Sequence, residues 1–256
     1  MKHTVLLPGL LAALAALAPL TDCRAASLTK MLGAGAGDLL KAVTLSQSEV
    51  RELGKKTVAE MDAKNQVAPA NNAYVVRLNK IVADLRNEAG LNLNYKVYLT
   101  SQVNAFACPD GSVRVFSGLM DMMDDDELYF VIGHEIGHVA DGDSADKLKM
   151  AYAASGARKM AGASGGAVGA LSGSQLGSLG ESLVNAQFSQ SQESDADAYG
   201  LKLMQKNNKN QQAAVSALRK LATPGRAPSV FDSHPDANKR ADAIAAKLEK
   251  GTSRRK

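Results

Sequence analysis

The sequence predicts an α+β fold that is mostly α, with one small antiparallel sheet in a single domain. From Ser46 onward, apolar residues recur mainly at the spacing of helices. The stretch from Leu93 to Phe116 instead contains short runs with a period of two, as strands with one buried face do. The chain has 256 residues, 45% of them hydrophobic, which is enough for one well-packed core. No internal repeat or composition shift marks a second domain within residues 46–250.

The N-terminus has the pattern of an export signal that precedes the fold. A lysine at position 2 is followed by an apolar, Ala/Leu-rich run over residues 5–18. This run is too short to favour a membrane-spanning helix. We expect residues 1–22 to be a signal peptide of lipoprotein type and residues 23–45 to be a lead-in that tethers the domain.

Cys23 ends the sequence Leu-Thr-Asp-Cys, which is typical of a bacterial lipobox. One position departs from the pattern, because Asp22 stands where a small residue normally precedes the cysteine. We expect Cys23 to be lipidated, with ordinary signal cleavage near Ala26 as the alternative. Lipidation would leave Cys108 without an intramolecular partner, so we expect it to be a small buried apolar side chain. If Cys23 stays a thiol, a Cys23–Cys108 bridge is the alternative.

Helices are predicted from local signals in the order of the chain. The sequence Ser-Gln-Ser-Glu at 46–49 resembles a capping box, and Gly90 ends the second helical pattern. Four acidic residues at 124–127 stand at the start of the third helix, where they offset the positive end of its dipole. The predicted helices are 46–62, 74–89, 124–141, 183–206, 211–222 and 236–249. Residues 155–180 are rich in Gly, Ala and Ser, which suits either a flexible connection or close-packed helices that form a lid.

Three short strands are predicted between the second and third helices. They cover residues 93–99, 103–107 and 112–116. The turn signal Pro-Asp-Gly at 109–111 separates the last two strands. We therefore expect a small antiparallel sheet.

The charge pattern argues against a nucleic-acid partner. The formal net charge is +4, from 30 basic and 26 acidic residues, and part of the excess lies in the basic tail at 251–256. Proteins that bind nucleic acids cluster Lys and Arg on one element, often with stacking aromatic residues. This chain has no such cluster, so we expect no nucleic-acid partner.

The predicted helix 124–141 carries an H-E-x-x-H motif, formed by His134, Glu135 and His138. Histidines four residues apart lie on the same face of a helix, so both imidazoles can reach one metal ion. Glu135 is offset by about 100° around the helix, so it can address a water on the metal without binding the metal itself. Gly133 and Gly137, also four apart, allow another element to pack closely against this helix.

A catalytic zinc site needs three protein ligands and one open position, so a third ligand must come from elsewhere. The predicted helix 183–206 offers Glu193 and Asp197, whose carboxylates share a face. Glu193 would complete the ligand set, and Asp197 would accept the free ring N–H of a ligand histidine. We expect Asp195 to point elsewhere, into solvent. The alternative is that Glu193 and Asp197 belong to an ordinary solvated helix face.

A third motif follows downstream, where His234 precedes a proline and Arg240 stands six residues later. The series H-E-x-x-H, E-x-x-x-D and His-Pro with a downstream arginine resembles peptidase family M48, a family of gluzincin metallopeptidases. Within that family, the pattern resembles the LoiP-like branch of bacterial outer-membrane lipoprotein proteases. Further stretches that resemble this branch are 103–107, 116–119 and 188–190. The similarity covers about residues 46–248.

The resemblance implies a zincin-like (gluzincin) fold with one zinc ion per chain. The implied zinc ligands are His134, His138 and Glu193. Glu135 would be the catalytic acid and base, and His234 and Arg240 would help to hold the substrate or the oxyanion. For His234 a loop-capping role is the alternative, and for Arg240 a place on the helix surface.

The implied function is that of a zinc-dependent endopeptidase acting on misfolded or envelope proteins. A zinc-activated water would attack the peptide carbonyl while Glu135 takes up its proton. The strand 103–107, if it lies at the sheet edge, could pair with an extended polypeptide substrate along Asn104, Ala105 and Phe106. Asn104 alternatively satisfies a strand end.

The resemblance also implies a location. The protein would act in the bacterial periplasm, held at the outer membrane through lipidated Cys23, or free in the periplasm without that lipid. The lipid anchor would be its only membrane contact, and an envelope protein is a candidate partner.

Two other functions fit parts of the pattern. The protein could be an envelope scaffold or chaperone with a non-catalytic metal site, although a structural zinc site usually takes four ligands and needs no general base. It could also be an amidase acting on peptidoglycan peptides, since the chemistry is shared. The sequence separates this last function poorly from proteolysis.

Overall fold

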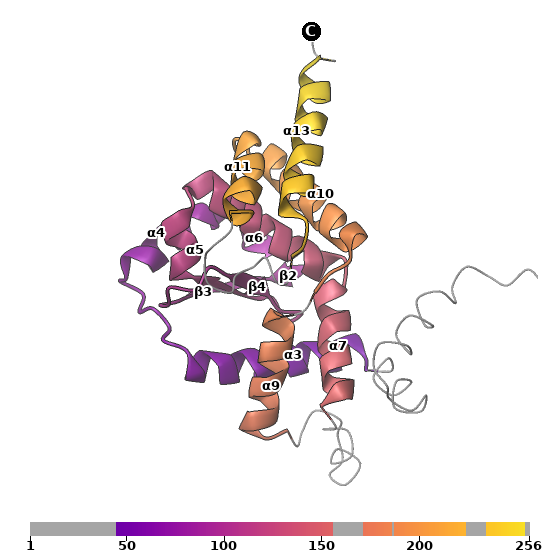
Figure 1. The fold of residues 1–256 in the computed structure, drawn as a ribbon. Coiled ribbons are helices and arrows are strands. Elements are labelled where there is room, and N and C mark those ends of the chain that lie inside the picture. Colours follow the sequence, from indigo (N-terminus) through magenta and orange to yellow (C-terminus); the bar gives the residue numbers. More distant parts are fainter. Residues whose placement is uncertain (1–44, 156–170, 186, 224–233, 254–256) are drawn as a thin grey trace, which may run out of the picture.

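The computed structural model describes residues 45–155, 171–185, 187–223 and 234–253. Helices lie on both sides of a small sheet (Figure 1). The predicted signal peptide, Cys23 and the lead-in up to residue 44 lie outside the described residues, as do residues 156–170 of the Gly/Ala/Ser-rich segment. No helix in the described part of the chain is long and apolar enough to cross a membrane.

Four of the six predicted helices are confirmed, with small shifts at their ends. They are α3 (Gln47–Lys64), α6 (Asp125–Ala140), α11 (Gln212–Leu221) and α13 (Ala237–Ser253). The predicted capping box starts α3: the Ser46 hydroxyl accepts from the Glu49 N–H, and the Glu49 carboxylate accepts from the Ser46 N–H. Asp124 and Glu127 form the same arrangement at the start of α6. The helix that carries the H-E-x-x-H motif therefore has a well-defined beginning.

The predicted helix 74–89 is too long. The helix α4 (Ala73–Ile81) is followed by a 3₁₀ turn, η1 (Ala83–Leu85). The chain then turns back on itself, so that β1 (Asn87–Glu88) pairs antiparallel with β2 (Leu91–Asn92). Ala89 and Gly90 make this turn with φ values of 55° and 68°, which a helix cannot accommodate.

The predicted helix 183–206 is in fact parts of two helices. The first, α9 (Gly173–Val184), ends at Asn185, and the second, α10 (Gln190–Lys206), begins after Ser189. Ser189 and Gln192 form a capping box, which sets the start of α10. The helices α5 (Ser117–Met122) and α7 (Asp143–Ala154) were not predicted, and most of α9 lies in the Gly/Ala/Ser-rich segment, for which close-packed helices were one of two expectations.

The main sheet has three strands in the order β3-β5-β4. They are β3 (Asn94–Tyr98), β4 (Ala105–Ala107) and β5 (Ser112–Phe116). Strands β4 and β5 are antiparallel across the predicted turn, but β3 pairs parallel with β5. The prediction of a wholly antiparallel sheet is therefore wrong for these strands. The reason is that β5 inserts between β3 and β4, so β3 meets the strand that runs in its own direction.

The helices α6 and α10 pack almost backbone to backbone. A Cβ atom at Gly133 would lie 3.1 Å from the Gly200 Cα, and one at Gly137 would lie 3.0 Å from the Ala196 Cα. Larger residues at these positions would push the helices apart, so the prediction of close packing at Gly133 and Gly137 is confirmed. This contact sets the distance between the H-E-x-x-H motif and the acidic residues of α10.

Three hydrophobic clusters pack the described residues, and one of them, between α3 and the sheet, contains Tyr98, Phe106 and Phe116. The largest one surrounds α6 and includes residues of α4, α10, α11, α13 and the sheet. A smaller one joins α3, α7 and α9, which lie together below the sheet in Figure 1. The mostly helical fold class with small sheets is confirmed.

Candidate metal centre

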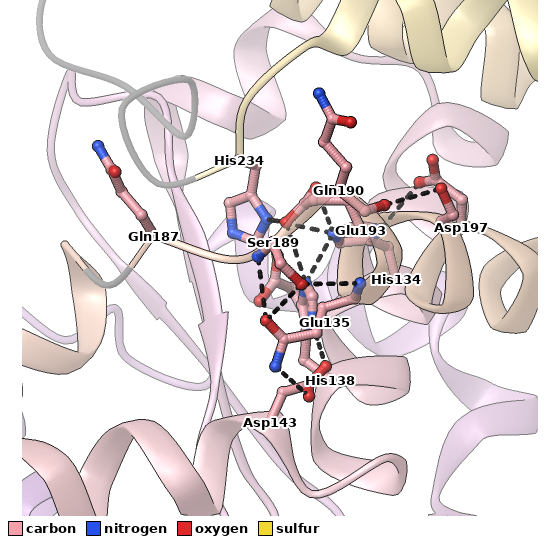
Figure 2. Close-up of polar contacts among 12 residues, drawn as sticks. His134, Glu135, His138, Asp143, Gln187, Ser189, Gln190, Glu193, Asp197 and His234 are labelled. Atoms are coloured by element: carbon pink, nitrogen blue, oxygen red, sulfur yellow. Dashed lines mark hydrogen bonds and ion pairs between the residues drawn. The ribbon is translucent and has the colours of Figure 1, made fainter. Parts of the chain in front are cut away.

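The side chains of four buried residues converge between α6, α10 and the start of α13 (Figure 2). One possible ligand atom from each lies within 4.8 Å of all the others. These residues are His134, His138, Glu193 and His234. Two imidazoles four residues apart on α6 face the same point, as the motif predicted.

The distances within this cluster fit a zinc ion. The Nε2 atoms of His134 and His138 are 3.1 Å apart, and Glu193 Oε1 lies 3.4 Å from His138 Nε2. Glu193 Oε2 lies 3.7 Å from His134 Nε2. Atoms that bind one zinc ion tetrahedrally at about 2.0–2.1 Å lie about 3.3 Å from each other. The spacing and the mixture of two imidazoles with a carboxylate therefore suit zinc.

His234 is the fourth member of the cluster. Its Nδ1 lies 2.8 Å from Glu193 Oε1 and 3.2 Å from His134 Nε2, and its Nε2 lies 3.5 Å from Glu135 Oε1. The downstream histidine is thus brought to the two α6 histidines across 100 residues of sequence. Residues 231–233, which precede it in the sequence, lie outside the described residues.

Glu135 is buried beside the two histidines, with its carboxylate toward the same space. Its Oε1 atom is enclosed and has no hydrogen-bond partner among the described residues. A buried carboxylate oxygen without a partner costs free energy unless a water, ion or ligand meets it. This oxygen is therefore placed to meet a water, an ion or a ligand in the space beside the histidines.

His134 is held from behind by two charged residues. Its Nδ1–H donates to Asp197 Oδ1 over 2.9 Å, and the Arg240 guanidinium binds the same carboxylate with distances of 2.8 and 2.6 Å. Burial alone would raise the pKa of Asp197, but the hydrogen bonds from Arg240 and His134 lower it below its usual value. Burial lowers the pKa of His134. The imidazole therefore stays neutral, with Nε2 free to bind a metal ion.

His138 is held by a residue that the sequence analysis missed. Its Nδ1–H donates to Asp143 Oδ2 over 3.0 Å, and the Gln192 amide donates to Asp143 Oδ1 over 2.5 Å. Burial alone would lower the pKa of His138, but hydrogen bonds to Asp143 and Glu193 raise it to about 9. Asp143 comes directly after Gly142, whose φ of 82° turns the chain from α6 into α7. An acidic residue five positions after the second histidine, following a glycine, is the sequence signal for it.

Arg240 lies at the back of the centre rather than on the helix surface. Its side chain is buried and contacts the carboxylates of both Asp197 and Glu193. Burial alone would raise the pKa of Glu193, yet hydrogen bonds to His138 and His234 lower it well below its usual range. Glu193 is therefore ionised, as a zinc ligand must be. Asp195 is exposed on α10, as expected.

The predicted substrate strand lies at an edge of the sheet and packs against α6. Ala105 and Phe106 are buried in β4, and the Phe106 ring contacts Tyr98 and Phe116 in a core cluster. Asn104 precedes the strand, and its side chain accepts from the Ala105 N–H. The Phe106 ring is thus part of the core, and Asn104 satisfies the strand end.

An apolar recess adjoins Glu135. Besides His134, Glu135, His234 and Arg240, its lining consists of Phe130, Val131, Leu218, Leu221 and Ala237. These apolar residues come from α6, α11 and α13. Apolar side chains therefore border the centre on this side.

Cys108 lies away from the centre, in the core between α3 and the sheet. It is a fully buried free thiol, and burial raises its pKa well above the usual value. A thiol that remains protonated is a poor metal ligand and nucleophile. The expectation of a small buried apolar side chain is confirmed.

Comparisons with known proteins confirm the resemblance on which the site was predicted. The model of peptidase family M48 matches residues 47–248. Metalloprotease LoiP of Escherichia coli K12 is 43% identical over 243 residues, which are 94% of this chain and 96% of that protein. Metalloprotease YcaL of the same strain is 40% identical over 254 residues, 98% of this chain and 100% of that protein. Protease HtpX of Acinetobacter baumannii (strain AYE) is 44% identical over 81 residues, 30% of this chain and 27% of that protein.

Proposed function

Because the chain belongs to peptidase family M48 and is a zinc metallopeptidase, we propose that it acts as an endopeptidase on misfolded or envelope proteins. We assign the zinc ligands to His134, His138 and Glu193, and the role of general base to Glu135. The observation that carries this proposal is the buried cluster of ligand atoms, all within 4.8 Å of one another, with the unpartnered Glu135 oxygen beside it.

The chemistry divides between the metal and the protein. Bound zinc supplies Lewis-acid chemistry, polarising the peptide carbonyl and lowering the pKa of a water to about 7. Glu135 Oε1 accepts the proton of the attacking water and then delivers it to the leaving amine. Asp197 and Asp143 keep the Nε2 atoms of the two ligand histidines directed at the metal.

His234 and Arg240 have different roles in this proposal. The Nδ1 atom of His234 is engaged by Glu193 Oε1 at 2.8 Å, whereas Nε2 lies 3.5 Å from Glu135 Oε1, so the Nε2–H can donate to the oxyanion that develops on the substrate. The Arg240 guanidinium is already bound by two carboxylates, Asp197 and Glu193. We therefore assign Arg240 to positioning of the ligands rather than to contact with the substrate.

The substrate is proposed to be an extended polypeptide. Strand β4 is an edge strand, so a peptide could add to it as a further strand and pass over α6. Backbone pairing of this kind is tolerant of sequence, which suits misfolded proteins.

The location is proposed from the sequence of the N-terminus. The lipobox-like pattern that ends at Cys23 supports a lipid anchor at the outer membrane, with the domain in the periplasm. Incorporation of labelled palmitate into the wild-type protein, and its loss in Cys23→Ala, would support the anchor. An unlabelled wild-type protein would contradict it.

The test of the function is zinc content together with cleavage of unfolded casein. We expect the wild-type protein to bind zinc and cleave casein, and Glu135→Gln to keep its zinc but lose at least about a hundredfold in activity. Glu127→Gln is the matched control, because Glu127 is a buried glutamate of the same helix that binds Lys220 and Ser216 instead. Unchanged activity in Glu135→Gln would contradict the mechanism. Cleavage of peptidoglycan peptides but not of casein would favour the amidase, and zinc binding without either activity would favour a scaffold.

A further inference from the structure

The ring of Phe188 lies against the metal centre, although none of the roles proposed above involves it. It stacks on the His138 imidazole with ring centroids 3.8 Å apart and planes 13° apart. It also stacks against the His234 ring, at 5.1 Å and 28°. Phe188 is largely buried and precedes the first helical residue of α10 by two positions.

The segment around Phe188 is fixed to α7 and α10. The Lys147 ammonium lies 5.2 Å from the centre of the Phe188 ring and donates to the Gln187 carbonyl. On the other side, Ser189 caps α10 through Gln192, whose amide also binds Asp143. The Phe188 ring is therefore held in place by its neighbours, and its position does not depend on the histidines alone.

The two ligand histidines are oriented in different ways. Both Asp197 and Arg240 contact the Nδ1 atom of His134. The Phe130 ring lies at an angle to the His134 imidazole, with ring centroids 6.3 Å apart and planes 49° apart, so the two rings do not stack. His138 has one carboxylate behind it, Asp143. A single hydrogen bond to Nδ1 fixes that atom but lets the ring tilt about the bond. A ring stacked on its face removes this freedom, because tilting would lose contact area.

We propose that Phe188 is a positioning residue of the metal centre. Its ring fixes the plane of the His138 imidazole, so that Nε2 points at the metal ion, and it keeps water from that face. This proposal rests on the assignment of His138 as a zinc ligand under the proposed function. Phe188 touches the ligand and not the reacting atoms, so its effect passes through metal binding and ligand geometry.

The test compares Phe188→Leu, which keeps apolar volume but removes the ring, with Phe188→Tyr, which keeps the ring. We expect the zinc dissociation constant of Phe188→Leu, measured by chelator competition, to rise roughly tenfold or more. The visible spectrum of its cobalt-substituted form should shift, since that spectrum reports ligand geometry. On casein, kcat should fall more than KM changes. Phe188→Tyr should stay within about threefold of wild type in zinc affinity, with an unchanged cobalt spectrum.

Phe116→Leu is the matched control, because Phe116 is a buried aromatic residue of the Tyr98–Phe106–Phe116 cluster away from the centre. It should lose stability but keep the wild-type zinc affinity. If Phe188→Leu bound zinc like the wild type, with the same cobalt spectrum, the positioning role would be wrong. Equal loss of affinity in the Leu and Tyr variants would also contradict it. A wild-type protein that bound no zinc would instead contradict the proposed function.

Discussion

The protein contains two arginine–aspartate pairs with nearly the same geometry in two different regions, one with a partly exposed aspartate and one with both residues buried. In the first, Arg114 binds Asp62 through Nε and Nη2, at 2.8 and 2.9 Å. In the second, Arg240 binds Asp197 through the same two nitrogens, at 2.8 and 2.6 Å. Both are two-pronged pairs of the kind that arginine forms with carboxylates.

The two pairs differ in what else the aspartate holds. Asp62, on α3, also accepts from the Tyr98 hydroxyl and the Lys96 ammonium, both at 2.8 Å. It therefore ties α3 to the sheet. Asp197 accepts instead from the ring N–H of His134, a proposed zinc ligand. Under the proposed function, the third partner therefore sets the role of each pair: Asp62 connects two elements of the fold, whereas Asp197 orients a proposed metal ligand.

The largest expected effect is a loss of unfolding free energy when the Arg114–Asp62 pair is broken. Asp62→Ala would leave the buried Arg114 guanidinium without its carboxylate, which costs about 3–5 kcal/mol in unfolding free energy. Zinc affinity should stay within about twofold of wild type, because Asp62 makes no described contact with the centre. Urea unfolding and chelator competition measure the two quantities. If folded Asp62→Ala lost much of its zinc affinity, the claim that the Arg114–Asp62 pair affects only stability would be wrong.

Breaking the Arg240–Asp197 pair should have a smaller effect, and mainly on zinc affinity rather than on the free energy of unfolding. Asp197→Ala removes the acceptor for the His134 N–H, so zinc affinity should fall roughly 10–100-fold. Arg240 would keep one buried carboxylate partner, Glu193, so the loss of stability in the metal-free protein should be less than in Asp62→Ala. Chelator competition and urea unfolding of the metal-free protein measure this. A zinc affinity like that of the wild type would show that the second pair is structural as well.

The smallest expected effect is the response to pH, which should separate the regions without mutation. A zinc ion requires neutral imidazoles, and the pKa of His138 is raised to about 9. Protons therefore compete with zinc below that pH, and zinc affinity should rise about fivefold between pH 8 and 9. The pKa of Asp62 is instead lowered, since the hydrogen bonds from Arg114, Lys96 and Tyr98 outweigh the effect of burial. Its contribution to stability is constant above its ordinary pKa and is lost only in acid.

Isothermal titration with zinc at several pH values measures the first effect, and acid unfolding of the metal-free protein measures the second. A zinc affinity that did not change between pH 7 and 9 would mean that His138 is already neutral in the metal-free protein.

Local signals in the sequence predicted several elements well. The capping box at Ser46 and Glu49, and the acidic start of α6, act over four residues and need no tertiary context. The H-E-x-x-H motif is equally local, because one helical turn places both histidines. The placement of Glu193 and Asp197 on one face of a helix was also predicted, because residues four apart lie one helical turn from each other.

What the sequence analysis missed depends on turns and on partners distant in sequence. The break before α10 was signalled by Ser189 and Gln192, a capping box that an apolar pattern alone does not reveal. Asp143 reaches His138 only because Gly142 adopts a positive φ. The direction of β3 relative to β5 could not be predicted from the alternation of apolar and polar residues, since this alternation is the same in parallel and antiparallel strands. In the sequence, Phe188 belonged only to the stretch 188–190 that resembles the LoiP-like branch. Its stacking on His138 joins residues distant in sequence and so could not be predicted without the fold.

The central claim is that zinc is bound by His134, His138 and Glu193. The most direct test is a crystal structure of the zinc-loaded protein with anomalous scattering measured at the zinc edge. We predict one strong peak per chain, within about 2.0–2.2 Å of the Nε2 atoms of both histidines and a carboxylate oxygen of Glu193. A peak elsewhere, or one whose ligands do not include Glu193, would contradict the claim.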